Sequence, residues 1–226
     1  MTKFVERTKV RQLRLEGKSY SEIRKVVKVS KSSLSLWLKD ISLTGDQLKR
    51  IKGKKEKAIE SFIETMKLKR ERKLLDYYTK QKKNWLPLSE RELFLSGLFL
   101  YWGEGNKASR NTVSVSNTDP NVIKFSILWL VKSLKVPKNK VKVSLQLYSD
   151  MNINESTNYW VKELGIPAEQ FNKPYIKIST RSLIDQKGFG HGTCNISVQN
   201  TVIKENLLMA IKAMADFYSE KAKNLV

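Results

Sequence analysis

The sequence predicts an α+β protein whose N-terminal third is entirely helical. Strand-like alternation of apolar and polar residues occurs only after residue 105, and segments with helical spacing of apolar residues separate the alternating ones. Residues 46–84 contain no proline and a single glycine, and their apolar residues recur at helical spacing. Helices and alternating strands in this mixture are typical of the α+β class.

The first 44 residues predict three short helices. Residues 4–16 carry apolar side chains among charges and end at Gly17, a helix-stop signal. Ser19 and Glu22 have the spacing of a capping box, which opens a second helix. Ser30 is suited to cap a third. Residues 1–44 therefore form a small helical module.

Three short helices with a tight turn before the last resemble a helix-turn-helix of the homeodomain-like or resolvase type. The resemblance implies that the first turn of the third helix enters the major groove of DNA. Hydroxyl groups discriminate poorly between bases, so this turn is expected to position the protein as much as to select a sequence. A small helical interaction module is the alternative. The residues expected to face DNA are Lys31, Ser32, Ser33 and Ser35.

Residues 45–88 predict a basic helical linker with a break near Gly53. Lysine and arginine occupy the faces of the helix opposite its apolar positions. Such a helix either follows a phosphate backbone or is a solvated connector, and the sequence leaves both open. The turn Trp85-Leu86-Pro87-Leu88 ends it, so a second domain is expected over residues 89–226.

The second domain is organised around a helix predicted between Ser89 and Gly105. Ser89 and Glu92 form another capping box, and Gly105 fits the left-handed position that ends many helices. The intervening run is apolar on every side, which predicts burial against more than one neighbour. Glu104 is its only charge beyond Glu92.

The rest of this domain alternates between strands and helices. Four segments alternate as half-buried strands do: 112–117, 140–148, 175–180 and 194–199. Three segments have helical spacing: 120–134 after the N-cap Asp119, 154–164, and 202–222.

A net charge of +21 in 226 residues predicts a polyanionic partner, of which nucleic acid is the usual one. Residues 1–44 contribute +7, residues 45–84 contribute +8 and residues 85–226 contribute +6. The excess is therefore N-terminal. A lysine-rich chain can also reflect the composition of its whole proteome. The single cysteine fits a reducing compartment, and neither a membrane span nor a signal peptide is predicted. The expected location is cytoplasmic, in association with the nucleoid.

The sequence Leu100-Tyr101-Trp102-Gly103-Glu104-Gly105 resembles the C-terminal half of the motif of LAGLIDADG homing endonucleases. The phrases Ser-Asn-Thr-Asp-Pro at 116–120, Gly-Ile-Pro at 165–167 and His-Gly-Thr-Cys at 191–194 are similar to those of single-motif members. The resemblance covers about residues 89–222. It implies an αββαββα core with one extra helix at 154–164.

The resemblance also implies a metal site and a dimer. Glu104 stands at the position of the metal-binding acid, with the Gly103 carbonyl beside it, and the cofactor would be Mg²⁺ or Mn²⁺. One motif copy implies a homodimer, because two motif helices make one site. Phe99 departs from the small residue that the family prefers. The implied dimer interface contains Ser96, Gly97, Leu100 and Gly103.

The polar faces of the predicted strands would then line a saddle over the major groove. Its residues are Lys142, Ser144, Gln146, Tyr148, Lys177, Ser179, Asn195, Ser197 and Gln199. Lys177 is the first choice for a basic catalytic residue that stabilises charge on the phosphate, and Lys107 and Arg181 follow. The ordinary interpretation of each is a phosphate contact without a chemical role. His191 is expected in a turn or at the DNA rather than as a general base.

Three interpretations remain open. The first is a homodimeric, metal-dependent endonuclease that cleaves double-stranded DNA at specific sequences. The second is a catalytically silent transcriptional regulator on the same scaffold. The third is a structural nucleic-acid binder, of RNA included, in which Glu104 is only an ion-pair partner. All three predict neither a membrane nor a small-molecule cofactor as a partner.

Overall fold

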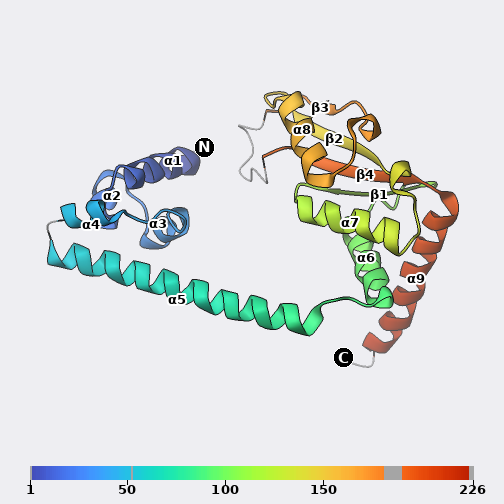
Figure 1. Ribbon diagram of the computed structural model, residues 1–226, viewed down its shortest axis with the longest axis horizontal. Coiled ribbons are helices and arrows are strands. Elements are labelled where there is room, and N and C mark those ends of the chain that lie inside the picture. Colours follow the sequence, from blue (N-terminus) through green and yellow to red (C-terminus); the bar gives the residue numbers. More distant parts are fainter. Residues whose placement is uncertain (1, 52, 181–189, 224–226) are drawn as a thin grey trace. The chain divides into compact units, whose positions relative to one another are not determined.

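The computed structural model describes residues 2–51, 53–180 and 190–223 (Figure 1). The chain divides into two compact units, Met1–Leu86 and Pro87–Val226. No helix among the described residues is both long and apolar enough to cross a membrane.

Every described element of the first unit is a helix, as the sequence predicts. Its elements are α1 (Thr2–Leu15), α2 (Tyr20–Val26), α3 (Lys31–Trp37), α4 (Gly45–Arg50) and α5 (Lys54–Trp85). The capping box of Ser19 and Glu22 opens α2, and the Ser30 hydroxyl accepts from the Ser33 amide at the start of α3. Gly17 has the left-handed φ of +90° that lets the chain turn after α1. The predicted break near Gly53 separates α4 from α5.

The first three helices enclose a small core of their own. Its buried residues are Val10, Ile23, Val27, Leu34 and Leu38. Leu13, Tyr20 and Trp37 pack around it. The apolar side of α3 therefore faces the module, which leaves its other side to solvent.

A buried ion pair joins α5 to this module. Arg14 Nη2 lies 2.9 Å from Glu60 Oε2, and both side chains are almost fully buried. The other carboxylate oxygen of Glu60 accepts from the backbone amide of Tyr20. Because a buried charge is stable only when it is paired and hydrogen-bonded, this contact fixes the N-terminal part of α5 on the module. The helix predicted as a linker thus belongs to the first unit.

A second ion pair predicts an acid-sensitive contribution to stability. Arg11 donates two hydrogen bonds to the Asp40 carboxylate, which lowers the pKa of Asp40 to about 2. The stability that this ion pair contributes is fully present above the ordinary carboxyl pKa near 4, and it is lost as the pH falls through 2. The pair is partly exposed, so we expect Asp40→Asn to cost less than about 1 kcal/mol at pH 7. Urea unfolding should show that the difference from wild type disappears near pH 2.

Among its described residues, the second unit combines four helices with one sheet. Its helices are α6 (Glu90–Glu104), α7 (Pro120–Lys132), α8 (Ile153–Leu164) and α9 (Thr201–Lys223), with short 3-10 turns at Lys138–Lys140 and Ala168–Gln170. Its strands are β1 (Thr112–Asn117), β2 (Lys142–Tyr148), β3 (Tyr175–Lys177) and β4 (Thr193–Gln199). This unit has the predicted α+β composition.

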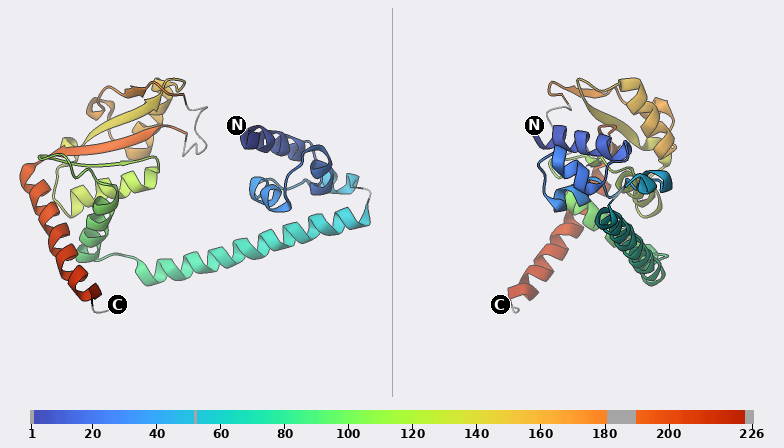
Figure 2. Two further views of the ribbon diagram at one scale, coloured as in Figure 1. Left: turned by 180° about the vertical axis from the view of Figure 1, so that it is seen from behind. Right: turned by 90° about the vertical axis from the view of Figure 1, so that its left-hand side faces the viewer.

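The sheet has the order β1-β4-β2-β3. β4 pairs antiparallel with β1 and β2, whereas β3 runs parallel to β2. Residues such as Val143, Leu145 and Ile196 point to one face, where a single core receives side chains from all four helices. The left view of Figure 2 shows α6, α7 and α9 together beside the sheet. The opposite face is polar.

The order of elements differs from the αββαββα order that the resemblance implies. Setting α8 aside leaves only one strand between α6 and α7. At the place of the other strand, Gly105 forms a single antiparallel bridge to Val115. Asn106 then accepts from the amides of Ala108 and Ser109, so a turn replaces further pairing. The third strand is also shorter than predicted, and Ile178 beyond its end is 98% exposed.

Two expectations about α6 need correction. Gly105 ends the helix with an extended backbone, φ −78° and ψ 151°, rather than a left-handed one. A glycine is needed there because a Cβ would overlap the Tyr101 ring. The helix is also not buried on every side. Gly97, Leu98 and Tyr101 face the core, while Ser96, Phe99 and Gly103 are exposed.

Candidate nucleic-acid interface and acidic site

The polar face of the sheet contains most of the residues predicted to contact DNA. The register places Lys142 beside Ser197, Ser144 beside Asn195, and Lys177 beside Tyr148. None of the four strands contains an acidic residue. Lysine, asparagine and glutamine side chains without competing carboxylates are suited to phosphates and base edges. The face holds Thr112, Ser114, Ser116, Lys142, Ser144, Gln146, Tyr148, Tyr175, Lys177, Thr193, Asn195, Ser197 and Gln199, of which Ser114 is buried.

Several of these side chains are already ordered by one another. Asn195 Nδ2 donates to Ser116 Oγ at 2.7 Å, and Asn172 donates to Ser144 Oγ at 2.9 Å. The Lys177 ammonium lies 4.9 Å from the centre of the Tyr148 ring. Ser179, which was predicted within β3, follows it, and its carbonyl accepts from the Ser149 amide. These contacts order several donors and acceptors of a face whose side chains are mostly half-buried, with Lys142, Tyr175 and Gln199 exposed.

Glu104 lies in the last turn of α6, and its side chain is exposed. No hydrogen bond or ion pair reaches its carboxylate from any residue that the structure describes. The C-terminal end of a helix carries partial negative charge, so an unpaired carboxylate there is unfavourable. The fold therefore gains nothing evident from this acid. The ion-pair partner required by the third interpretation is not among the described residues.

A buried lysine lies below this turn. Lys204 of α9 is fully buried, and its ammonium lies 2.6 Å from the Tyr101 hydroxyl and 2.5 Å from the Asn106 carbonyl. Burial and then the charge of Lys107 lower the pKa of Lys204, and burial raises the pKa of Tyr101 to about 12. The Lys107 ammonium donates to the Trp102 carbonyl at 2.8 Å. Two cations thus hold the backbone on both sides of Glu104.

Lys204 is the site residue that sequence reasoning missed. The sequence does contain a signal for it. Lys204, Leu207 and Ile211 share one side of α9, and all three are buried. A lysine on the apolar side of an amphipathic helix is a candidate for a buried cation.

The structure does not bring Lys177 together with Glu104 within one chain. Glu104 precedes the bridge to β1 at one edge of the sheet, and Lys177 lies on β3 at the other edge. Three strand spacings separate these edges, which is about 14 Å. Arg181 lies outside the described residues. His191 stacks on the Tyr159 ring at 3.8 Å, in the turn before β4, and Lys107 is the predicted cation nearest to Glu104 in the chain.

The outward side of α6 is an unpartnered apolar surface. Phe99 is 49% exposed and Trp102 is 39% exposed, and their rings stack with centroids 6.0 Å apart. A Cβ on Gly103 would meet no atom within 4 Å. Three of the four residues predicted for a dimer interface lie on or beside this side: Ser96, Leu100 and Gly103. Gly97 does not, because it packs against the Trp129 ring of its own chain.

The exposed side of α3 carries three of the four residues predicted to contact DNA. Lys31, Ser32 and Ser35 are exposed, whereas Ser33 is half-buried. The hydroxyls of Ser32 and Ser33 each lie 2.9 Å from the Ser30 hydroxyl, so part of their hydrogen-bonding capacity serves the helix cap. Of the four, Lys31 and Ser35 are therefore the residues whose exposed side chains take no part in the helix cap.

Comparisons of the chain with protein-family models, with curated proteins and with solved structures find no match.

Proposed function

We propose that the chain is a homodimeric DNA endonuclease of the LAGLIDADG type that hydrolyses phosphodiester bonds of double-stranded DNA with a divalent metal. The observation that carries the proposal is Glu104, an exposed and unpaired carboxylate at the unfavourable end of α6. An acid that stabilises neither the helix nor an ion pair is a candidate for a working group.

The donor atoms at the end of α6 fit a hard divalent cation in their chemistry. A carboxylate and the last carbonyls of a helix, which have no intrahelical partner, are oxygen ligands of the kind that Mg²⁺ prefers. Among the described residues of one chain, no three carboxylate, imidazole or thiolate side chains gather. The proposal therefore requires two copies of Glu104, one from each subunit. When bound, such a cation supplies charge neutralisation and an activated water.

The outward side of α6 supports the dimer that this requires. Ser96, Phe99, Leu100 and Gly103 follow the i, i+3, i+4, i+7 spacing of one helix face. Small residues at both ends of such a face permit close approach of a second helix. Exposed aromatic surface of this kind marks interaction sites. A twofold pairing of α6 would place two Glu104 carboxylates near the same axis.

The chain's own residues would bind and orient DNA. The acid-free polar face of the sheet supplies amides, hydroxyls and the ammonium groups of Lys142 and Lys177. The helix-turn-helix module supplies Lys31 and Ser35. Lys107 and Lys204 would hold the turn that carries Glu104.

A regulator without cleavage activity is the second candidate. The observation that favours it is the separation of Lys177 from Glu104, because the first-choice catalytic cation does not lie beside the acid within one chain. The module and the polar face would serve a regulator equally well.

One experiment separates the two candidates. The protein is incubated with Mg²⁺ and a library of random duplexes, and both new ends and retained duplexes are sequenced. We expect new ends at a recurring sequence, with none when Ca²⁺ replaces Mg²⁺, because calcium coordinates at longer distances. Retained duplexes without new ends would instead establish the regulator.

A further inference from the structure

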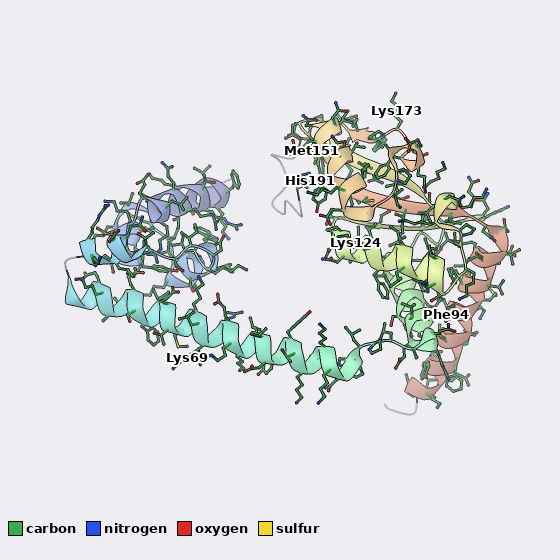
Figure 3. The ribbon with its side chains drawn as sticks, viewed as in Figure 1. Lys69, Phe94, Lys124, Met151, Lys173 and His191 are labelled. Carbon is green, nitrogen blue, oxygen red and sulfur yellow. The ribbon has the colours of Figure 1, made fainter. Side chains whose placement is uncertain are left out.

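The distal part of α5, residues 68–85, buries none of its side chains against the rest of the first unit. Every residue of this segment is exposed, including Tyr78 at 64% and Trp85 at 67%. Helix propensity alone leaves a segment of this length marginally stable in water. A solvent-exposed helix of this kind is available to a partner. We call residues 68–85 the distal helix; Figure 3 shows side chains that project from α5 both above and below its ribbon.

The distal helix is strongly basic. It contains seven basic residues and two acidic ones, a net charge of +5. No ion pair joins any of the seven to another described residue, and the one aromatic contact among them places Lys73 over Tyr77 at 5.4 Å. The basic residues are Lys69, Arg70, Arg72, Lys73, Lys80, Lys82 and Lys83.

Four of the lysines form a stripe along one side of the helix. They are Lys69, Lys73, Lys80 and Lys83, at positions i, i+4, i+11 and i+14. At 1.5 Å per residue the stripe is about 21 Å long. Duplex DNA carries one negative charge per about 1.7 Å of its axis, so about twelve phosphates lie within that length.

We propose that the distal helix is a second DNA-binding element, which contacts the phosphate backbone through this lysine stripe independently of sequence. The proposal rests on the proposed function in taking duplex DNA as the partner. The buried pair of Arg14 and Glu60 fixes the start of α5 on the helix-turn-helix module. The stripe is therefore held in a set relation to α3, and its contacts add to those of α3.

Charge argues against a second copy of the helix as the partner. The seam that would form a coiled coil runs through Leu74, Tyr78 and Trp85, but Lys67, Glu71 and Gln81 interrupt it. Two such helices would also bring like charges together. An anionic membrane surface fits less well, because Lys69, Arg70 and Arg72 point to different sides of the helix and leave no continuous apolar face there.

The test compares two quadruple variants of the full chain. One replaces the stripe by glutamine: K69Q, K73Q, K80Q and K83Q. The matched control removes four exposed lysines of the second unit: K132Q, K135Q, K162Q and K223Q. Both lose the same charge. Binding to a labelled duplex of unselected sequence is followed by fluorescence anisotropy between about 50 and about 200 mM salt, the range over which phosphate contacts dominate. Circular dichroism verifies that both remain helical.

For the stripe variant we expect the negative slope of log affinity against log salt to become shallower by about 3. The affinity for the duplex near 0.1 M salt should fall about 100-fold. The control should keep the wild-type slope. Equal slopes for the stripe variant and wild type would overturn the proposal while leaving the proposed function intact. Tighter binding of wild type to phosphatidylserine vesicles than to the duplex would also overturn it. No binding of wild type to any duplex would remove the proposed function as well.

Discussion

Replacing Glu104 by glutamine is expected to abolish DNA cleavage while duplex binding persists or strengthens. The substitution keeps the shape of the side chain and removes the charge that a divalent cation requires. Loss of several kcal/mol of metal-derived stabilisation corresponds to about 10³-fold in rate. Binding should not weaken, because a carboxylate beside phosphates is repulsive. Cleavage of a duplex recovered from the random library measures the first effect, and anisotropy measures the second.

The same variant should be slightly more stable than wild type. The unpaired carboxylate lies at the negative end of the α6 dipole, so its removal is worth about 0.3–1 kcal/mol. Urea unfolding measures this difference, and Glu90→Gln in the first turn of α6 is the matched control with the opposite expected sign. A Glu104→Gln protein that is less stable than wild type yet still cleaves DNA would make Glu104 a structural residue.

The local structure of this chain could be predicted from the sequence because its caps are explicit. Ser19, Ser30 and Ser89 each place a hydroxyl where the first amides of a helix need an acceptor, and all three caps are present. Alternation predicted β1 and β4 and the polar side of the sheet in the same way. These signals are local in sequence, so they do not depend on which elements meet.

What the sequence could not supply was contact between distant residues. An α6 that is apolar all round does not reveal which side meets Trp129 and which side stays exposed, so the sequence alone does not assign Gly97 to the buried side. Gly105 signals a helix end in the sequence, but only the structure shows that the Tyr101 ring excludes a Cβ there. The separation of Lys177 from Glu104 follows from strand order, which alternation does not contain.

Leucine substitutions of two glycines on opposite sides of α6 are expected to have different effects. Gly97→Leu is expected to destabilise the second unit by about 3 kcal/mol, because even a Cβ overlaps the Trp129 ring and a close-packed core resists the shift. Gly103→Leu should keep the unit folded and within about 1 kcal/mol of wild type, since the position is open and leucine is the better helix former.

The readouts of this pair are unfolding and assembly, measured separately. Urea unfolding followed by near-ultraviolet circular dichroism should report the loss in Gly97→Leu alone. Sedimentation velocity at micromolar concentration should show a dimer for wild type and a monomer for Gly103→Leu, because helix separation at a crossing is set by the side chains there. If Gly103→Leu remains a dimer, the outward side of α6 is not the interface. The two Glu104 carboxylates would then not meet at a twofold axis, and the proposed metal site would lack its second half.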